Sequence, residues 1–179
     1  MSGPLHEQVA LVTGASRGIG RTVACRLAQA GAHVAVNFVH NVAGAEETVR
    51  RITDAGGHAE PLQFDVADAD AVTDAVSGLA ERRGRCDILI NNAGMTVDGL
   101  LLRLKATDWD QVMAVNLRAP FRLMRAAAST AVATSASWRA AEKCARGMAS
   151  VRLPRTSPAP LNSGAATART AGFSSPMLM

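Results

Sequence analysis

The amino-acid sequence predicts an α/β protein with an incomplete, doubly wound parallel sheet: the first four strands, their flanking helices, and an irregular C-terminal tail. Short apolar runs alternate strictly with segments of helical periodicity over the first 125 residues, an order typical of parallel sheets with right-handed crossovers. The first run leads directly into a glycine-rich turn. Both signals stop at about Arg125, and the residues after it predict the tail.

The first strand, helix and second strand follow from local pattern. Residues 9–13 predict a buried parallel strand because they are apolar and end at a glycine. Residues 18–30 carry apolar side chains at helical spacing and stop at Gly31, which predicts a helix. Residues 33–38 form the next β-type run.

The middle of the chain repeats this order. Residues 41–55 predict a second helix with one apolar face, ended by two glycines. Residues 61–64 predict a short third strand, which leads to Asp65 and Val66. Asp68 is suited to cap the helix that comes next, because its carboxylate can accept from free backbone N–H groups.

The last predicted strand covers residues 86–90, and a further helix begins at residues 107–110. The apolar face predicted for that helix consists of Trp109, Val112, Met113, Phe121 and Met124. Ligands of doubly wound sheets bind at the carboxyl ends of the strands. The Gly14 turn, Asn37, Asp65 and residues 91–94 all follow strands, so we expect them to converge on one crevice.

Composition predicts one cytoplasmic globular domain. The chain has 179 residues, 48% of them hydrophobic, which suffices for a core, and no apolar run is long enough to span a membrane. The N-terminus has no signal-peptide pattern. The three cysteines, Cys25, Cys86 and Cys144, lack CxxC spacing and predict reduced thiols without a metal site.

The net charge of +4 does not predict a nucleic-acid partner. Acidic and basic residues nearly balance up to residue 125, and the excess comes from single arginines scattered beyond it. No aromatic platform or nucleic-acid motif accompanies them. Nucleic-acid binding is therefore a weak alternative.

The glycines at positions 14, 18 and 20 predict a Rossmann-like cradle for a dinucleotide pyrophosphate. A strand precedes them and a helix follows, so backbone N–H groups at a helix N-terminus would face the anion. A tight turn without a ligand is the alternative. The second strand ends in Asn37 rather than an acid, and Arg17 lies in the turn, so NADP(H) is favoured over NAD(H). Arg17 could also be a solvated loop residue.

These motifs resemble those of the short-chain dehydrogenase/reductase family. Residues 13–20, Asp65 with Val66, residues 91–94, and Asn116 carry the resemblance. Residues 92–105, together with the segment around Asp108 and Asn116, are most similar to the 3-oxoacyl-[acyl-carrier-protein] reductases of fatty acid synthesis. The resemblance covers about residues 5–128. It therefore implies that residues 1–128 are the N-terminal part of a Rossmann domain and that residues 129–179 are an atypical tail.

The resemblance also implies residue roles. The predicted cofactor-binding residues are Gly14, Ser16, Arg17, Gly18, Ile19, Gly20, Asn37, Asp65, Val66, Asn92, Ala93 and Gly94. By the same resemblance Asn91 would tie neighbouring strands together. Asn116 corresponds to the family's catalytic asparagine, which holds a water in a proton relay; a mid-helix residue with local backbone bonding is the alternative. The implied substrate is a 3-oxoacyl thioester, free or bound to acyl-carrier protein, and the implied assembly is a homo-oligomer.

The family's proton-transfer residues, a Ser and a Tyr followed four residues later by a Lys, are not found. The chain contains no tyrosine, and its only lysines are Lys105 and Lys143. Family spacing from Asn116 would place the three residues near Cys144, Ser157 and Leu161, none of which supplies the required chemistry. We therefore expect a reductase that is inactive or impaired.

Two other interpretations stay open: a non-enzymatic NADP-binding protein, and a non-functional product of a truncated or frameshifted gene. Of the 54 residues from 126 to 179, 40 are Ala, Ser, Thr, Arg, Pro or Gly, a composition typical of a GC-rich gene read out of frame. Without a fifth strand, residues 86–90 would be a bare sheet edge, and the apolar face of the last helix would be exposed.

Overall fold

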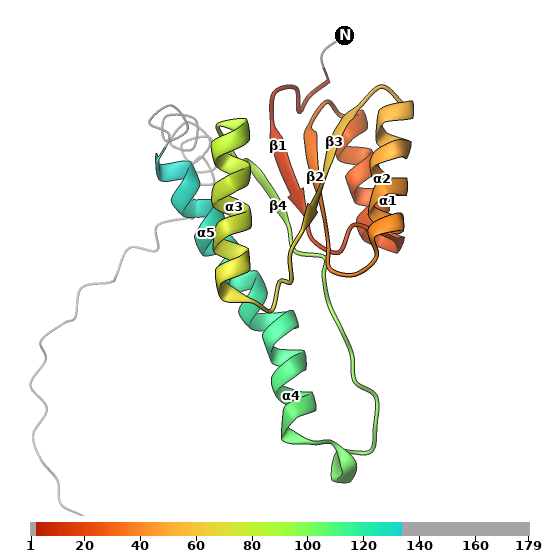
Figure 1. Cartoon of the computed structure of the whole chain (residues 1–179), viewed down its shortest axis with the longest axis vertical. Helices are drawn as coiled ribbons and strands as arrows, with labels where there is room; N and C mark the ends of the chain where they lie inside the picture. Colours follow the sequence, from red (N-terminus) through yellow and green to blue (C-terminus); the bar gives the residue numbers. More distant parts are fainter. Residues whose placement is uncertain (1–2, 134–179) are drawn as a thin grey trace, which may run out of the picture.

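The computed structural model describes residues 3–133, and it contains a four-stranded parallel sheet with helices on both faces (Figure 1). The strand order is β3-β2-β1-β4, and all three strand pairs are parallel. The elements are β1 Val9–Val12, α1 Gly18–Gln29, β2 His33–Phe38, α2 Val42–Asp54, β3 His58–Gln63, α3 Ala69–Arg83, β4 Ile88–Ile90, a 3-10 turn Leu101–Arg103, α4 Ala106–Met113, a π-helical segment Ala114–Arg118, and α5 Ala119–Ala133. The predicted Rossmann-like fold class is confirmed.

Each face of the sheet packs into its own core because successive side chains of a strand point to opposite faces. Ala10 and Val12 of β1 pack with the α1 and α2 side. Leu11, between them, packs with the α3 and α5 side, where Leu79 and Leu123 are fully buried. Figure 1 shows the two helix layers on either side of the sheet. The apolar run at β1 is thus buried on both faces, as its composition predicts.

The structure corrects two strand boundaries. The third strand begins at His58, earlier than predicted, and Pro61 lies inside it rather than at its start. A proline is tolerated there because β3 is an edge strand of the described sheet, so one side of it needs no donor. The fourth strand covers only Ile88–Ile90. Asp87, just before it, still bonds to β1: its N–H donates to the Val9 carbonyl oxygen at 2.9 Å, and its carboxylate accepts from the Val9 N–H at 2.9 Å.

The predicted apolar face of the last helix does not pack into the core. Trp109, Phe121 and Met124 are 65%, 60% and 53% exposed, whereas Ala119 and Leu123 are buried. The other two residues of the predicted face, Val112 and Met113, are half-buried. The expectation that this face is exposed is therefore confirmed for Trp109, Phe121 and Met124, and within residues 3–133 no strand pairs with the outer edge of β4.

None of the helices in the described part of the chain is long and apolar enough to cross a bilayer.

Candidate functional site

The predicted cofactor loop lies where the loops after β1 and β4 touch. Gly14 has φ +61°, in the left-handed region that favours glycine. A Cβ on Gly14 would lie 3.1 Å from Cα of Ala93, so this position also requires close backbone approach. β1 and β4 are adjacent, which makes this the point where chain order reverses across the sheet. Doubly wound proteins bind their ligands at such a point.

The N-terminus of α1 is open to an anion. Arg17 is its N-cap residue, but its side chain makes no capping hydrogen bond, and the first turn contains no acidic residue. Gly18 has φ +57°, and a Cβ added to it would meet nothing within 4 Å. The side chain of Ile19 is 76% exposed. The first N–H groups of a helix lack intrahelical acceptors and carry partial positive charge, so this end of α1 suits a phosphate.

Asn92 joins the two loops rather than only lining them. Its Nδ2 donates to the carbonyl oxygens of Thr13 at 2.8 Å and Gly14 at 3.1 Å. In return, the Thr13 hydroxyl accepts from the backbone N–H groups of Asn92 at 3.0 Å and Ala93 at 2.9 Å. In the described part of the chain, Asn92 therefore makes the contacts between neighbouring strands that were expected of Asn91. Thr13 belongs to the motif of residues 13–20, but the sequence did not predict it as a site residue.

Asn37 supports the loop from inside the sheet. Its side chain is 1% exposed, and Oδ1 accepts from the Gly14 N–H at 3.1 Å. Nδ2 donates to the carbonyl oxygens of Phe64 at 2.9 Å and Leu62 at 3.3 Å. Both polar atoms are thus used by the fold. Asn37 thus supports the loop from behind, and its contact with a cofactor stays a prediction.

Asp65 and Val66 differ in what they can present to a ligand. Asp65 is exposed at the carboxyl end of β3, and its Oδ1 accepts from the Ala67 N–H at 2.8 Å. Val66 is 4% exposed and packs in the core with Val72. Of the two side chains, only the Asp65 carboxylate can face a ligand, and Val66 has only its backbone to offer.

Asn116 clamps the loop after β4. Its Nδ2 donates to the carbonyl oxygen of Met95 at 2.8 Å, and its Oδ1 accepts from the Met95 N–H at 2.9 Å. The residue is exposed, and both polar atoms of its amide bond to the backbone of Met95. Gly94 lies beside it, since a Cβ there would be 3.3 Å from Oδ1 of Asn116. Asn116 thereby orders the loop that contains the predicted cofactor residues Ala93 and Gly94.

The backbone around Asn116 is π-helical, and Pro120 explains why. A proline inside a helix has no N–H to donate, and its ring conflicts with the carbonyl four residues earlier, which here is that of Asn116. The N–H of Ala119 instead bonds to the oxygen of Ala114, five residues back. The Asn116 carbonyl therefore lacks its usual α-helical donor, and this leaves it an acceptor suited to a water.

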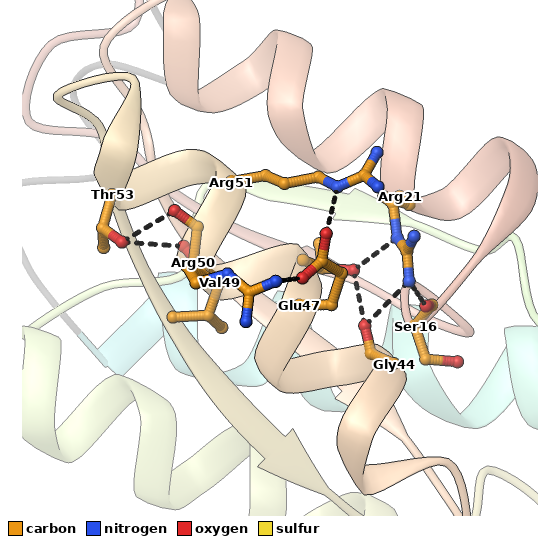
Figure 2. Close-up of polar contacts among 9 residues, drawn as sticks. Ser16, Arg21, Gly44, Glu47, Val49, Arg50, Arg51 and Thr53 are labelled. Atoms are coloured by element: carbon orange, nitrogen blue, oxygen red, sulfur yellow. Dashed lines mark hydrogen bonds and ion pairs between the residues drawn. The ribbon is translucent and has the colours of Figure 1, made fainter.

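Arg21 and Thr48 are further site residues that sequence reasoning missed. The Arg21 guanidinium donates to the carbonyl oxygens of Ser16 and Gly44 and, at 3.0 Å, to the Thr48 hydroxyl (Figure 2). Thr48 is fully buried, and its hydroxyl lies within donating distance of the carbonyl oxygens of Ala15 at 3.0 Å and Gly44 at 2.9 Å. These contacts tie the loop to α2. Those between α2 and the loop or α1 join positions 23 to 33 residues apart, which no local pattern reveals.

The structure describes two of the three cysteines and does not describe the residues of the tail. Cys25 and Cys86 are free thiols, and burial raises the pKa of Cys86 to about 11, so it is uncharged at neutral pH. Within residues 3–133 no group of three His, Cys, Asp or Glu side chains is arranged to hold a metal ion. The predictions for Lys143, Cys144, Ser157, Leu161 and the tail fall outside the described residues.

A cavity of about 940 Å³ lies between α3 and α5, away from the cofactor loop. Its lining includes Leu117, Phe121 and Arg125 but none of the predicted cofactor residues. The converging hydrogen bonds around Gly14 therefore locate the candidate site better than cavity size does.

Known proteins of similar sequence belong to one family. The family model described as short chain dehydrogenase matches residues 8–137. The 3-oxoacyl-[acyl-carrier-protein] reductase FabG of Staphylococcus aureus (strain N315) is 44% identical over 118 residues, which cover 66% of this chain and 48% of that protein. The 3-oxoacyl-[acyl-carrier-protein] reductase of Synechocystis sp. is 44% identical over 122 residues, covering 68% and 49%. The chain spans about half the length of these curated relatives.

Solved structures give the same result. A metagenomic short-chain oxidoreductase in complex with NADP matches with a TM-score of 0.69 and 42% identity, over 72% of this chain and 58% of that one. A short chain dehydrogenase from Burkholderia cenocepacia J2315, also in complex with NADP, matches with a TM-score of 0.67 and 43% identity, over 70% and 51%.

Proposed function

The chain belongs to the short-chain dehydrogenase family, and on that premise we propose that residues 14–20 hold the phosphates of NADP(H) in an oxidoreductase of the 3-oxoacyl-[acyl-carrier-protein] reductase type. The observation that carries this proposal is the uncapped, exposed N-terminus of α1 next to the Gly14 turn. A phosphate there would accept from several backbone N–H groups without displacing a capping side chain. The residues present therefore fit the group.

The preference for NADP(H) over NAD(H) rests on charge. An acid at the end of β2 would bond the ribose 2′-hydroxyl and repel a 2′-phosphate. The residue there is Asn37, whose amide is buried, and no acid follows it through His40. Arg17 is exposed at the mouth of the loop, where its planar guanidinium can pair with a phosphate. These two features support a 2′-phosphorylated cofactor, such as the NADP named in the two solved relatives.

Asn92 and Asn116 are proposed to order the part of the site that would face the nicotinamide of the cofactor. Asn92 holds Gly14 against Ala93, and Asn116 holds Met95, so both asparagines order the loop after β4. The released carbonyl of Asn116 is the proposed acceptor for a relay water. The exposed Asp65 carboxylate is the proposed adenine contact.

NADPH, when bound, supplies the hydride that reduces a ketone. The alkoxide that develops needs a proton donor and a stabilising charge. The family's tyrosine is missing from the 179 residues, and neither lysine occupies the family's catalytic position. We therefore propose that this polypeptide, by itself, binds NADPH with little or no turnover. A 3-oxoacyl thioester substrate, a homo-oligomeric assembly and a cytoplasmic location belong to the same proposal.

Two measurements on the full chain test it. Fluorescence titration is expected to show saturable NADPH binding tighter than NADH binding, and Arg17→Met is expected to reduce that preference without changing NADH affinity. Arg26→Met, a substitution on the exposed face of α1 near its other end, serves as the matched control. Absence of NADPH binding would refute the cradle, and an unchanged preference in Arg17→Met would refute the role of Arg17.

Turnover is tested separately by following NADPH oxidation with acetoacetyl thioesters. No rate above background is expected. A measurable rate that disappears in Asn116→Ala would refute the proposed inactivity and would assign proton transfer to residues other than the family's tyrosine and lysine. Binding without turnover would favour the non-enzymatic interpretation over a misfolded product.

A further inference from the structure

Arg21 stands behind the cofactor loop, one turn into α1. Its guanidinium reaches three oxygen atoms: the carbonyl of Ser16, the carbonyl of Gly44 at 3.0 Å and the hydroxyl of Thr48 at 3.0 Å (Figure 2). Ser16 belongs to the loop, whereas Gly44 and Thr48 belong to α2. One half-buried side chain thus joins the two segments that flank the predicted phosphate site.

All three partners of Arg21 are neutral. Glu47, the acid of α2 labelled in Figure 2, is paired instead with Arg50 and Arg51, the latter at 2.7 Å. None of the ion pairs within residues 3–133 includes Arg21. The positive charge of Arg21 therefore interacts with backbone dipoles, and those dipoles are the ones that shape the loop.

The orientation of the Ser16 carbonyl matters for anion binding. A carbonyl oxygen that faces a phosphate repels it, whereas the N–H groups of the same loop attract it. Arg21 holds the Ser16 oxygen on the α2 side, and the Ala15 oxygen lies 3.0 Å from the Thr48 hydroxyl, whose single proton is shared between it and the Gly44 oxygen at 2.9 Å. Two successive carbonyls are thereby turned away from the open side of the loop, where Arg17 and Gly18 are exposed.

The second partner extends the effect to the adenosine side. Gly44 lies in the first turn of α2, where its N–H is bonded to the Asn41 side chain at 3.0 Å, and Asn41 comes shortly after the end of β2. The residues at the end of β2 are the ones proposed to favour NADP(H) over NAD(H), because no acid there would repel a 2′-phosphate. Arg21 couples that segment to the loop through the Gly44 carbonyl.

We infer that Arg21 is a positioning residue for dinucleotide phosphates: it holds the loop carbonyls away from the anion and fixes the start of α2 against the loop. The inference rests on the proposed function and deepens it. It concerns geometry more than net charge, because the guanidinium donates to these oxygens from two different nitrogens of one rigid plane, whereas the three donors of an ammonium sit on a single nitrogen. Lysine is therefore not expected to replace it.

The test uses the full chain and the variants Arg21→Ala, Arg21→Lys and Arg51→Met. NADPH is titrated by fluorescence at a temperature where circular dichroism shows every variant to be fully folded, so a loss of fold alone would not change Kd. Arg21→Ala is expected to raise Kd about tenfold or more, since hydrogen bonds to a charged group are lost. Arg21→Lys is expected to raise the Kd for NADPH by nearly the same factor. The matched control Arg51→Met, which removes an exposed α2 arginine bonded to Glu47, is expected to bind like the wild type.

Adding free guanidinium to Arg21→Ala distinguishes a positioning role from a purely structural one, because only a positioning role predicts recovery of NADPH affinity without a change in stability. In Arg21→Ala, low-millimolar guanidinium is expected to restore part of the NADPH affinity without raising the melting temperature, whereas methylammonium at equal ionic strength is not. Wild-type binding with equal affinity in Arg21→Ala, or full binding in Arg21→Lys, would overturn the inference while leaving the proposed function intact. Failure of the wild type to bind NADPH would instead refute the proposed function itself.

Discussion

Gly20 is the glycine whose replacement best tests the geometry of the site. It lies in the first turn of α1, and a Cβ added to it would be 2.5 Å from Nδ2 of Asn92, 2.5 Å from the carbonyl oxygen of Gly14 and 3.0 Å from Cα of Ala15. Real Cβ atoms do not approach other atoms so closely. Two of the three neighbours are backbone, which cannot swing away as the end of a flexible side chain can.

Two effects of opposite sign compete in Gly20→Ala. Helix propensity favours alanine by about 1 kcal/mol. Overpacking costs about 1–3 kcal/mol, and the upper end applies here because the backbone of the loop must move. The Asn92 bonds to Thr13 and Gly14 would be strained by the same shift. We expect a net loss of about 1–2 kcal/mol in the free energy of unfolding.

Gly78 in α3 is the matched control. A Cβ there meets only the flexible end of Arg82, at 3.2 Å, so Gly78→Ala keeps the propensity gain without the clash. It is expected to stabilise the protein by about 1 kcal/mol. Urea unfolding followed by circular dichroism measures both variants, with equal m-values as the condition for comparing midpoints. A Gly20→Ala protein as stable as wild type, or as stable as Gly78→Ala, would refute the packing that places Asn92 against α1.

Two further predictions concern titrating groups outside the site. Burial, reinforced by the charge of Arg83, lowers the pKa of His33 below its ordinary 6.5, so the folded state binds fewer protons than the unfolded state. The contribution of His33 to the free energy of unfolding is therefore expected to be fully present above pH 6.5 and to be lost as the pH falls from there through the lower pKa of the folded state. Urea midpoints between about pH 7.5 and 5 measure this, and His33→Gln should flatten the slope, whereas an unchanged slope would contradict the assignment. Burial raises the pKa of Cys86 to about 11, so its thiol is expected to resist alkylation at about pH 8 until the protein unfolds, while the half-buried Cys25 reacts sooner. Peptide mapping by mass spectrometry distinguishes the two, and equal labelling of both in the folded protein would show that Cys86 is accessible.

Local sequence pattern was sufficient for the order and type of the elements. The β2 boundaries were predicted to the residue, and Asp68 does accept from the N–H groups of Asp70 and Ala71 at the start of α3. Such features depend on periodicity, turn residues and caps that lie within a few positions of each other. The glycine turn was recognisable for the same reason. The π-helical segment was not expected, although Pro120 was visible as its cause.

Only the tertiary structure shows which polar residues at the strand ends support the loop and which are exposed to a ligand. The sequence by itself determined that Gly14, Asn37, Asp65 and Asn92 would lie at the same end of one parallel sheet. It did not separate the buried Asn37 and the bridging Asn92 from the exposed Asp65, because their partners lie 23 to 79 residues away. Those partners depend on which strands are neighbours, and strand order is a property of the folded sheet. Arg21, which joins the loop to a helix 23 residues further on, is recognisable only once the two segments are packed together.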